Sequence, residues 1–230
     1  MTKISRQIQI TEDGSHTLYV PEWDEHYHSV HGAIQEAKHI YLDAAFDYNK
    51  KSPVHILEIG FGTGLNAYLT LIQAQKMNRE VHYHSIELYP IEKENLQKLN
   101  YPDQIDYPHK DLFYKLHDAL WNTSQEITPG FHLHKILGDL TTYNFEDTYD
   151  IVYFDAFAPD VQPELWTPDI FAKIRKQLSP DAVLTTYSTK GIVKRALRAT
   201  GYIVKRLPGP PGKHQMLRAI PDIFINNSEK

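Results

Sequence analysis

The stretch of this sequence best suited to binding a ligand has glycines at alternate positions, Gly60, Gly62 and Gly64. Residues 54–57 before it are mostly apolar, which predicts a buried strand, and residues 65–75 after it contain no Gly or Pro and favour a helix. The glycines therefore lie on a strand-to-helix turn, where they allow the backbone to approach a ligand closely. The first turn of the helix offers free N–H groups and a positive dipole end to a polar or anionic group.

Acidic residues stand at the ends of four predicted strands, and these are Glu58, Glu87, Asp139 and Asp155. Ligands of open α/β sheets bind beyond the carboxyl ends of the strands, so the four acids are candidate ligand contacts. A carboxylate at the end of the second strand, here Glu87, can accept two hydrogen bonds from ribose hydroxyls. Asp139 suits a ligand-facing acceptor that reads an adenine amino group, and a helix cap is the alternative.

Strand and helix signals alternate along the rest of the chain. Further strands are predicted at 81–86, 131–137, 149–154, 181–187, 202–205 and 215–220, and helices at 33–49, 90–99, 163–178 and 192–198. A hairpin is predicted from 6–10 and 17–20, and residues 106–121 read as an ill-defined, partly helical insertion. The predicted fold is α/β: an open, twisted, mostly parallel sheet with an antiparallel closing strand (residues 51–230), preceded by a packed hairpin and helix extension (residues 1–50).

Two motifs carry a resemblance to a known family. The glycine turn with Glu58 resembles the E/D-x-G-x-G-x-G motif of class I S-adenosylmethionine (SAM) methyltransferases. The stretch from Asp155 to Trp166 resembles the D-x-F-A-P-x-x-x-P-x-x-W signature of the tRNA 5-methylaminomethyl-2-thiouridine methyltransferases, which modify the wobble uridine. Residues 187–191 and 212–216 extend the resemblance over nearly the whole chain. A chain of 230 residues without a second Gly-rich fingerprint resembles the stand-alone form, which lacks the FAD-dependent oxidase of the bifunctional members.

The resemblance implies the fold and the cofactor of class I methyltransferases. SAM is the expected cofactor, and neither FAD nor a metal is expected. The expected cofactor-binding residues are Glu58, Gly60, Phe61, Gly62, Gly64, Leu65, Asn66, Glu87, Leu88, Gly138, Asp139 and Leu140.

The implied reaction is methylation of the 5-aminomethyl group of wobble (2-thio)uridine. A nitrogen must present its lone pair to the methyl group, so Asp155 is the expected catalytic residue that orients the amine and helps to take its proton. Ala158 and Pro159 are also expected to contact the substrate: the backbone carbonyls of Phe157 or Ala158 are candidate second acceptors, and Pro159 would stiffen the loop. Phe157 and Trp166 offer flat faces to a flipped-out base. The alternatives are a helix N-cap for Asp155 and ordinary core positions for the two aromatics.

The charge distribution favours an RNA partner. The net charge is −5, yet residues 173–218 contain eleven Lys and Arg and one acid, so that stretch carries about +10 and the remainder about −15. The expected partner is the tRNA anticodon stem-loop, gripped through its phosphates by Lys190, Lys194, Arg195 and Lys213. Solvated basic helix faces are the alternative. Functional coupling to separate enzymes that install the aminomethyl group is also expected.

Other classes of protein are less favoured. Without Cys there is no disulfide or thiolate chemistry, and without a long apolar run no membrane association is expected, so the predicted location is cytoplasmic. A metal site at His26, His28 and His31 is conceivable, but a capping loop is favoured, and His82 and His84 read as half-buried strand positions. The competing functions are an aminopropyl transferase, a small-molecule or protein N-methyltransferase, and a SAM- or RNA-binding module without turnover.

Overall fold

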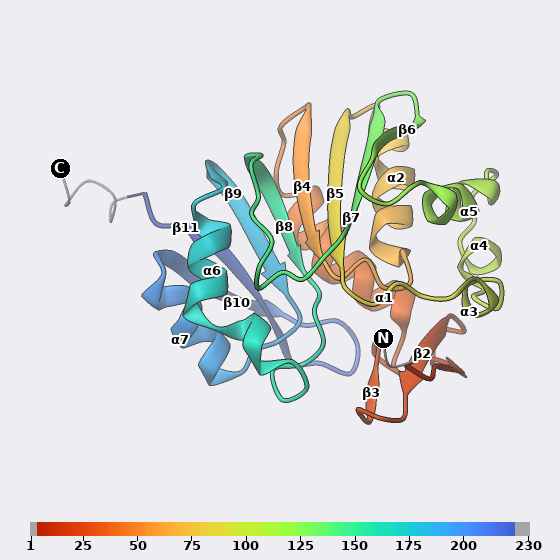
Figure 1. Ribbon diagram of the computed structural model, residues 1–230, viewed down its shortest axis with the longest axis horizontal. Helices are drawn as coiled ribbons and strands as arrows, with labels where there is room; N and C mark the ends of the chain where they lie inside the picture. The colour runs from red at the N-terminus through yellow and green to blue at the C-terminus, as the bar shows by residue number, and fades with distance from the viewer. Residues whose placement is uncertain (1–3, 224–230) are drawn as a thin grey trace.

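The structure is a computed structural model that describes residues 4–223; residues 1–3 and 224–230 of the two predicted domains lie outside the described part. Its main sheet has eight strands in the order β10-β11-β9-β8-β4-β5-β7-β6 (Figure 1). The central parallel strands are β4 (Val54–Ile59), β5 (Val81–Glu87), β7 (Phe131–Leu137), β8 (Tyr149–Phe154) and β9 (Leu178–Thr186). The antiparallel strands are β6 (Ser124–Thr128), β10 (Tyr202–Pro208) and β11 (Gln215–Pro221).

This topology confirms the predicted class I methyltransferase fold, including the antiparallel closing pair. Strand β6 was not predicted, because an edge strand with mostly polar residues lacks the alternation that marks a half-buried strand. Strand β9 begins at Leu178, three residues before the predicted start at Asp181. The helix predicted over 163–178 therefore ends earlier than expected.

Two of the predicted helices have nearly the predicted bounds, namely α2 (Leu65–Met77) and α7 (Gly191–Ala199). The helix predicted over 163–178 is broken into a 3₁₀ turn η2 (Pro163–Trp166) and α6 (Pro168–Arg175). Thr167 causes the break, because its hydroxyl accepts the N–H of Ile170 as an N-cap and Pro168 starts a new helix.

The remaining helical predictions are also corrected in detail. The helix predicted over 33–49 consists of a short α-helix α1 (Ala33–Ala37) that continues as a π-helix η1 (Lys38–Phe46). The predicted helix over 90–99 is reduced to α3 (Lys93–Leu96), followed by α4 (Tyr101–Gln104), and the insertion at 106–121 contains α5 (Asp111–Asp118).

Helices cover the two faces of the sheet and form two apolar cores (Figure 1). One core joins α1, η1, α2 and α5 to the sheet, and Val54 and Ile56 of β4 face it. The other core joins α6 and α7 to the sheet, and Leu57 and Ile59 face it. None of the helices in residues 4–223 has the length and apolarity to cross a membrane.

The predicted N-terminal hairpin is confirmed as β1 (Gln7–Ile10) and β2 (His16–Val20), and a short third strand β3 (Glu25–His26) adds to it. Arg6 fastens this small sheet to the main domain. Its guanidinium donates hydrogen bonds to the hydroxyl of Tyr27 at 2.8 Å, to Glu92 at 2.7 Å and to the carbonyl of Tyr89 at 2.8 Å. The small sheet therefore lies against the end of the main sheet where β5 terminates (Figure 1).

Candidate active site

A cavity of about 610 Å³ opens at the carboxyl ends of the parallel strands. It lies where β4 has β5 on one side and β8 on the other, which is the switch in strand order at which open α/β sheets bind ligands. Residues 25–30 of the N-terminal extension form the opposite wall. The predicted site residues that line the cavity are Gly60, Phe61, Gly62, Leu65, Asn66, Glu87, Leu88, Gly138, Asp139, Leu140, Asp155, Phe157 and Lys213.

The glycine turn is shaped by close contacts. Gly60 has a φ of 90°, and a β-carbon there would lie 2.9 Å from the carbonyl oxygen of Asp155. Gly62 has a φ of 48°, and its β-carbon would lie 3.2 Å from Cδ1 of Tyr27. Both positions therefore need glycine and both face the cavity. Gly64 does not line the cavity: it is the left-handed N-cap of α2, and a β-carbon there would lie 2.7 Å from Nε2 of His117.

Glu87 and Asp139 reach the cavity rim from neighbouring strands. Glu87 accepts the N–H of Gly62 at 3.0 Å on Oε2 and the N–H of Tyr89 at 2.7 Å on Oε1, so it also braces the glycine turn. Asp139 accepts the N–H and the hydroxyl of Thr141 at 2.8 and 2.7 Å, both on Oδ1. No helix follows Asp139 in the described residues before β8, so the helix-cap alternative is wrong: the carboxylate braces a local turn and lines the cavity.

Glu58 is placed differently from the expectation. Its side chain is fully buried and does not line the cavity. The hydroxyl of Ser85 on β5 donates to Glu58 Oε2 at 2.6 Å, and burial raises the pKa of Glu58 to about 8. The carboxyl group therefore lies beneath the glycine turn and links β4 to β5.

Asp155 is held from two directions. The hydroxyl of Tyr41 donates to Oδ1 at 2.6 Å, and the side-chain amide of Asn66 donates to Oδ2 at 2.8 Å. Burial raises the pKa of Asp155 to about 6, and these two hydrogen bonds oppose that rise. Because the donors are side chains rather than the N–H groups of a helix, the structure contradicts the N-cap alternative.

The loop after Asp155 presents one aromatic ring to the cavity and buries the other. Phe157 lines the cavity and meets the rings of Tyr27 and Trp23 edge-on, with centroid distances of 4.9 and 5.1 Å. Trp166 is only 3% exposed and packs 4.8 Å from Phe154, so its expected contact with a base is wrong and the core alternative is right.

The backbone of this loop is largely occupied by internal hydrogen bonds. The carbonyl of Phe157 accepts the indole N–H of Trp166 at 2.8 Å, and the carbonyl of Ala158 accepts the N–H groups of Val161 and Gln162 at 2.8 and 2.9 Å. Neither Ala158 nor Pro159 lines the cavity, which corrects the expectation that they contact the substrate. The internal bonds instead hold the turn that carries Phe157.

The basic residues divide into two groups. Lys213 lines the cavity, where its ammonium pairs with Glu36 and lies 4.4 Å from the ring centroid of Tyr187. Lys190 forms an exposed ion pair with Asp160. Lys190, Lys194 and Arg195 do not line the cavity, and they lie at the start of α7, directly after the end of β9.

Several cavity residues from the N-terminal extension were not predicted. Among them are Glu25, Tyr27 and Glu36 in the wall. Tyr41, which does not line the cavity but donates a hydrogen bond to Asp155, was not predicted either. No sequence motif marks these residues. The only signal was the aromatic and acidic composition of residues 21–32, which favoured a capping loop.

The three histidines of residues 21–32 have separate partners. Nε2 of His28 lies 2.7 Å from the hydroxyl of Thr63, whereas His26 contacts Gln9 and His31 contacts Glu12. They do not converge on one point, and His26 and His28 line the cavity, as the capping-loop interpretation requires.

Comparisons with known proteins agree with this geometry. Residues 122–222 match a family described as S-adenosyl-L-methionine-dependent methyltransferase. The chain is 33% identical over 224 residues to the tRNA 5-methylaminomethyl-2-thiouridine biosynthesis bifunctional protein MnmC of Burkholderia thailandensis, covering 90% of this chain and 33% of the relative. The chain therefore spans about a third of the length of this curated relative.

Two solved structures share the fold. The crystal structure of MnmC2 from Aquifex aeolicus has a TM-score of 0.79 at 24% identity and covers 95% of this chain and 71% of that chain. The spermidine synthase of Thermotoga maritima has a TM-score of 0.54 at 13% identity and covers 95% of this chain and 72% of that chain. At these identities both comparisons establish the fold alone.

The residues of the cavity fit SAM. Gly60 and Gly62 line the cavity, and without a side chain at either position the backbone of the turn can come close to a ligand. Glu87 and Asp139 add carboxylate acceptors at the ends of β5 and β7, where hydroxyl and amino groups of a nucleoside can be bound.

Proposed function

We propose that this chain is an S-adenosyl-L-methionine-dependent methyltransferase, as its likeness to that family and to the Burkholderia thailandensis relative supports, and that it methylates the 5-aminomethyl group of wobble (2-thio)uridine in tRNA. The product would be 5-methylaminomethyl-(2-thio)uridine, the nucleoside for whose biosynthesis the Burkholderia thailandensis relative is named. The observation that carries the proposal is the carboxylate of Asp155, held by Tyr41 and Asn66 at the wall of the cavity.

SAM would be held by the glycine turn, with Glu87 at its ribose and Asp139 at its adenine. When bound, SAM supplies an electrophilic methyl group on its sulfonium. The chain must then supply a binding place for the amine and an acceptor for its proton.

Asp155 is suited to that second task. An ammonium group has no lone pair, so the amine reacts only after it has given up a proton. The carboxylate accepts a hydrogen bond from the amine, orients the nitrogen and receives the proton. Its pKa of about 6 makes it a stronger base than an ordinary aspartate, which titrates near 3.9. Tyr41 and Asn66 fix the carboxylate, so that it need not reorient during the reaction.

The N-terminal extension would supply the substrate pocket. Phe157 lies against Tyr27 and Trp23, and this aromatic group offers a surface on which a flipped-out uridine can stack. Residues 1–50 would thus serve as the specificity element of the domain formed by residues 51–230. The ion pair of Lys213 with Glu36 at the cavity supports a position for Lys213 beside the base rather than on a phosphate.

The anticodon stem-loop is the proposed docking partner. Lys190, Lys194 and Arg195 lie at the start of α7, close to the loop that carries Phe157, because Lys190 pairs with Asp160 of that loop. Phosphate contacts there would position the RNA without reading its sequence. The substrate amine must come from separate enzymes that install an aminomethyl group, so the protein would act in the cytoplasm, after them and on the same tRNA.

The proposal is tested with the purified chain, SAM and tRNA that carries 5-aminomethyl-2-thiouridine. Mass spectrometry of the digested nucleosides should show conversion to the methylaminomethyl form. A parallel reaction with putrescine and decarboxylated SAM tests the aminopropyl transferase alternative, and small amines with SAM test a small-molecule N-methyltransferase. Turnover of either alternative without conversion of tRNA would overturn the proposal.

A further inference from the structure

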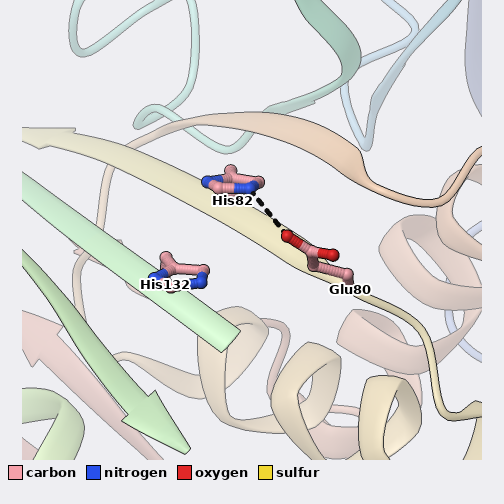
Figure 2. Close-up of side chains that lie close together, drawn as sticks. All are labelled: Glu80, His82 and His132. Atoms are coloured by element: carbon pink, nitrogen blue, oxygen red, sulfur yellow. Dashed lines mark hydrogen bonds and ion pairs between the residues drawn. The ribbon is translucent and has the colours of Figure 1, made fainter. Parts of the chain in front are cut away.

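A second group of chemically active side chains lies at the opposite end of the parallel strands, and we propose that it binds a divalent transition-metal ion of the Zn²⁺ class. The group consists of Glu80, His82 and His132 (Figure 2). One potential ligand atom from each residue lies within 4.8 Å of those of the others. Two imidazoles and a carboxylate are a donor set that suits Zn²⁺ and its neighbours in the first transition row.

The register of the sheet brings these donors together. His82 on β5 and His132 on β7 are directly paired positions, so their side chains leave the same face of neighbouring strands. Their rings are nearly parallel, at 10°, with centroids 4.8 Å apart. Glu80 precedes His82 by two residues and therefore shares its face, and its Oε1 lies 3.3 Å from Nε2 of His82 (Figure 2).

The surroundings leave the donors available to a ligand. His55 of β4 stacks on the other side of His82, with centroids 4.6 Å apart, and extends the row of imidazoles. Among the described residues, no side chain or backbone group forms a hydrogen bond with the ring nitrogens of His132, which is half-buried. The connection from β7 to β8, residues 138–148, contains no helix, so no helix from it covers these strands.

The geometry needs only side-chain rotation to complete a site. Zn²⁺ binds imidazole nitrogen at about 2.0–2.1 Å, so donors in a tetrahedral site are roughly 3.3 Å apart. Glu80 is exposed and the two rings are half-buried, and we expect an ion to draw the three side chains toward a common point. Water would complete the coordination. Mg²⁺ and Ca²⁺ prefer an all-oxygen set and are not expected here.

The ion would act on stability and not on methyl transfer. His82 is near the start of β5, whereas Glu87 at its end lines the cavity, so about 16 Å of strand separates the two sites. A bound ion would join β5 to β7 and would stabilise the folded chain by mass action. This inference does not depend on the proposed function.

The test uses the untagged full chain, freed of metal with a chelator. Calorimetric titration with Zn²⁺ should give one equivalent bound, and Co²⁺ should develop visible absorption bands. The double variant His82→Gln/His132→Gln should bind at least tenfold more weakly and should lose the rise in melting temperature that Zn²⁺ gives the wild type. The control His16→Gln/His39→Gln removes two histidines from other elements and should behave like the wild type.

Two results would overturn the inference. One is an absence of Zn²⁺ uptake by the wild type at 100 µM, and the other is equal affinity in the wild type and the His82/His132 double variant. If that double variant fails to fold, Glu80→Gln serves in its place, because Glu80 is exposed and contributes no core packing. It should bind Zn²⁺ several-fold more weakly, and an unchanged affinity would again contradict the site.

Discussion

The hydroxyl of Tyr41 donates a 2.6 Å hydrogen bond to Oδ1 of Asp155, across 114 residues of sequence. Tyr41 belongs to the π-helix η1, and its ring is almost completely buried. Asn66 of α2 holds the other carboxylate oxygen. The position of Asp155 is therefore fixed jointly by the N-terminal extension and by the helix that follows the glycine turn.

Asp155→Asn should abolish most of the methyl transfer and leave SAM affinity unchanged. Asparagine keeps an acceptor oxygen but cannot take the proton of the amine, and a general base contributes roughly 10²–10⁴-fold to rate. The rate is measured by single-turnover transfer to aminomethyl-uridine tRNA, and the SAM affinity by calorimetry. Asp160→Asn, an exposed acid on the same loop, is the matched control. A rate within a few-fold of wild type in Asp155→Asn would refute the role of base.

Tyr41→Phe should move the acidic limb of the pH–rate profile to higher pH. Activity requires the deprotonated Asp155, so the rate falls as pH drops through its pKa of about 6. The hydrogen bond from Tyr41 lowers that pKa, and its removal should therefore raise it. The measurement is kcat/KM between pH 5 and 8. Tyr48→Phe, an exposed position close by in the sequence, should leave the profile unchanged, whereas a profile unmoved in Tyr41→Phe would exclude this coupling.

Gly62→Val should weaken SAM binding at least tenfold. The φ of 48° is unfavourable for a β-branched residue, and the new β-carbon would lie 3.2 Å from the ring of Tyr27 and on the cavity side of the turn. Calorimetry measures the affinity. Gly130→Val is the control for backbone strain alone, because its φ is 77° and its β-carbon would meet only the Cα of Glu80 at 3.9 Å. If both variants lose SAM affinity equally, backbone strain explains the loss, and the glycine turn is not the SAM-binding site.

Neutralising Lys190, Lys194 and Arg195 together with Gln should weaken tRNA binding and reduce its salt dependence. The logarithm of the binding constant falls linearly with the logarithm of the salt concentration. Each phosphate contact that is lost should make this negative slope shallower by roughly 0.7–0.9. Filter binding at several salt concentrations measures both quantities. A triple Gln variant at the exposed Lys76, Lys98 and Lys110 removes the same charge elsewhere and serves as the control. Identical slopes in the two triple variants would place the RNA on another face.

Glu58→Gln should flatten the dependence of stability on pH. Burial raises the pKa of Glu58 to about 8 in the folded state, against about 4.3 in an unfolded chain. Between these values the folded state keeps a proton that the unfolded state has lost, so this group makes stability fall as pH rises, by at most about 1.4 kcal/mol per pH unit. Urea unfolding at pH 5, 6.5 and 8 measures the difference, with the exposed Glu126→Gln as control. If the free energy of unfolding changes with pH in the same way in the wild type and in Glu58→Gln, the raised pKa of Glu58 is contradicted.

The order of the strands and helices, and the edge of the sheet at which the cavity opens, follow from local sequence signals. The apolar run of β4, the glycine turn and α2 were all predicted, because strand, turn and helix signals depend on residues that are neighbours in the chain. The acids Glu87, Asp139 and Asp155 were located for the same reason: each directly follows an apolar strand, and parallel strands end at one edge. Helix breaks such as that at Thr167 were missed, although they too have a local cause.

Which side chains face the cavity, and which groups hold them, depends on packing between distant parts of the chain. Glu58 and Glu87 both lie at strand ends, yet Ser85 and the surrounding core enclose Glu58, whereas Glu87 reaches the rim. Trp166 was expected at the substrate and is buried against Phe154. The direction of a side chain at the end of a strand depends on the packing of elements distant in sequence. The contact of Tyr41 with Asp155 leaves no periodic signal in either segment, because it forms only when the N-terminal extension folds over the carboxyl end of the sheet.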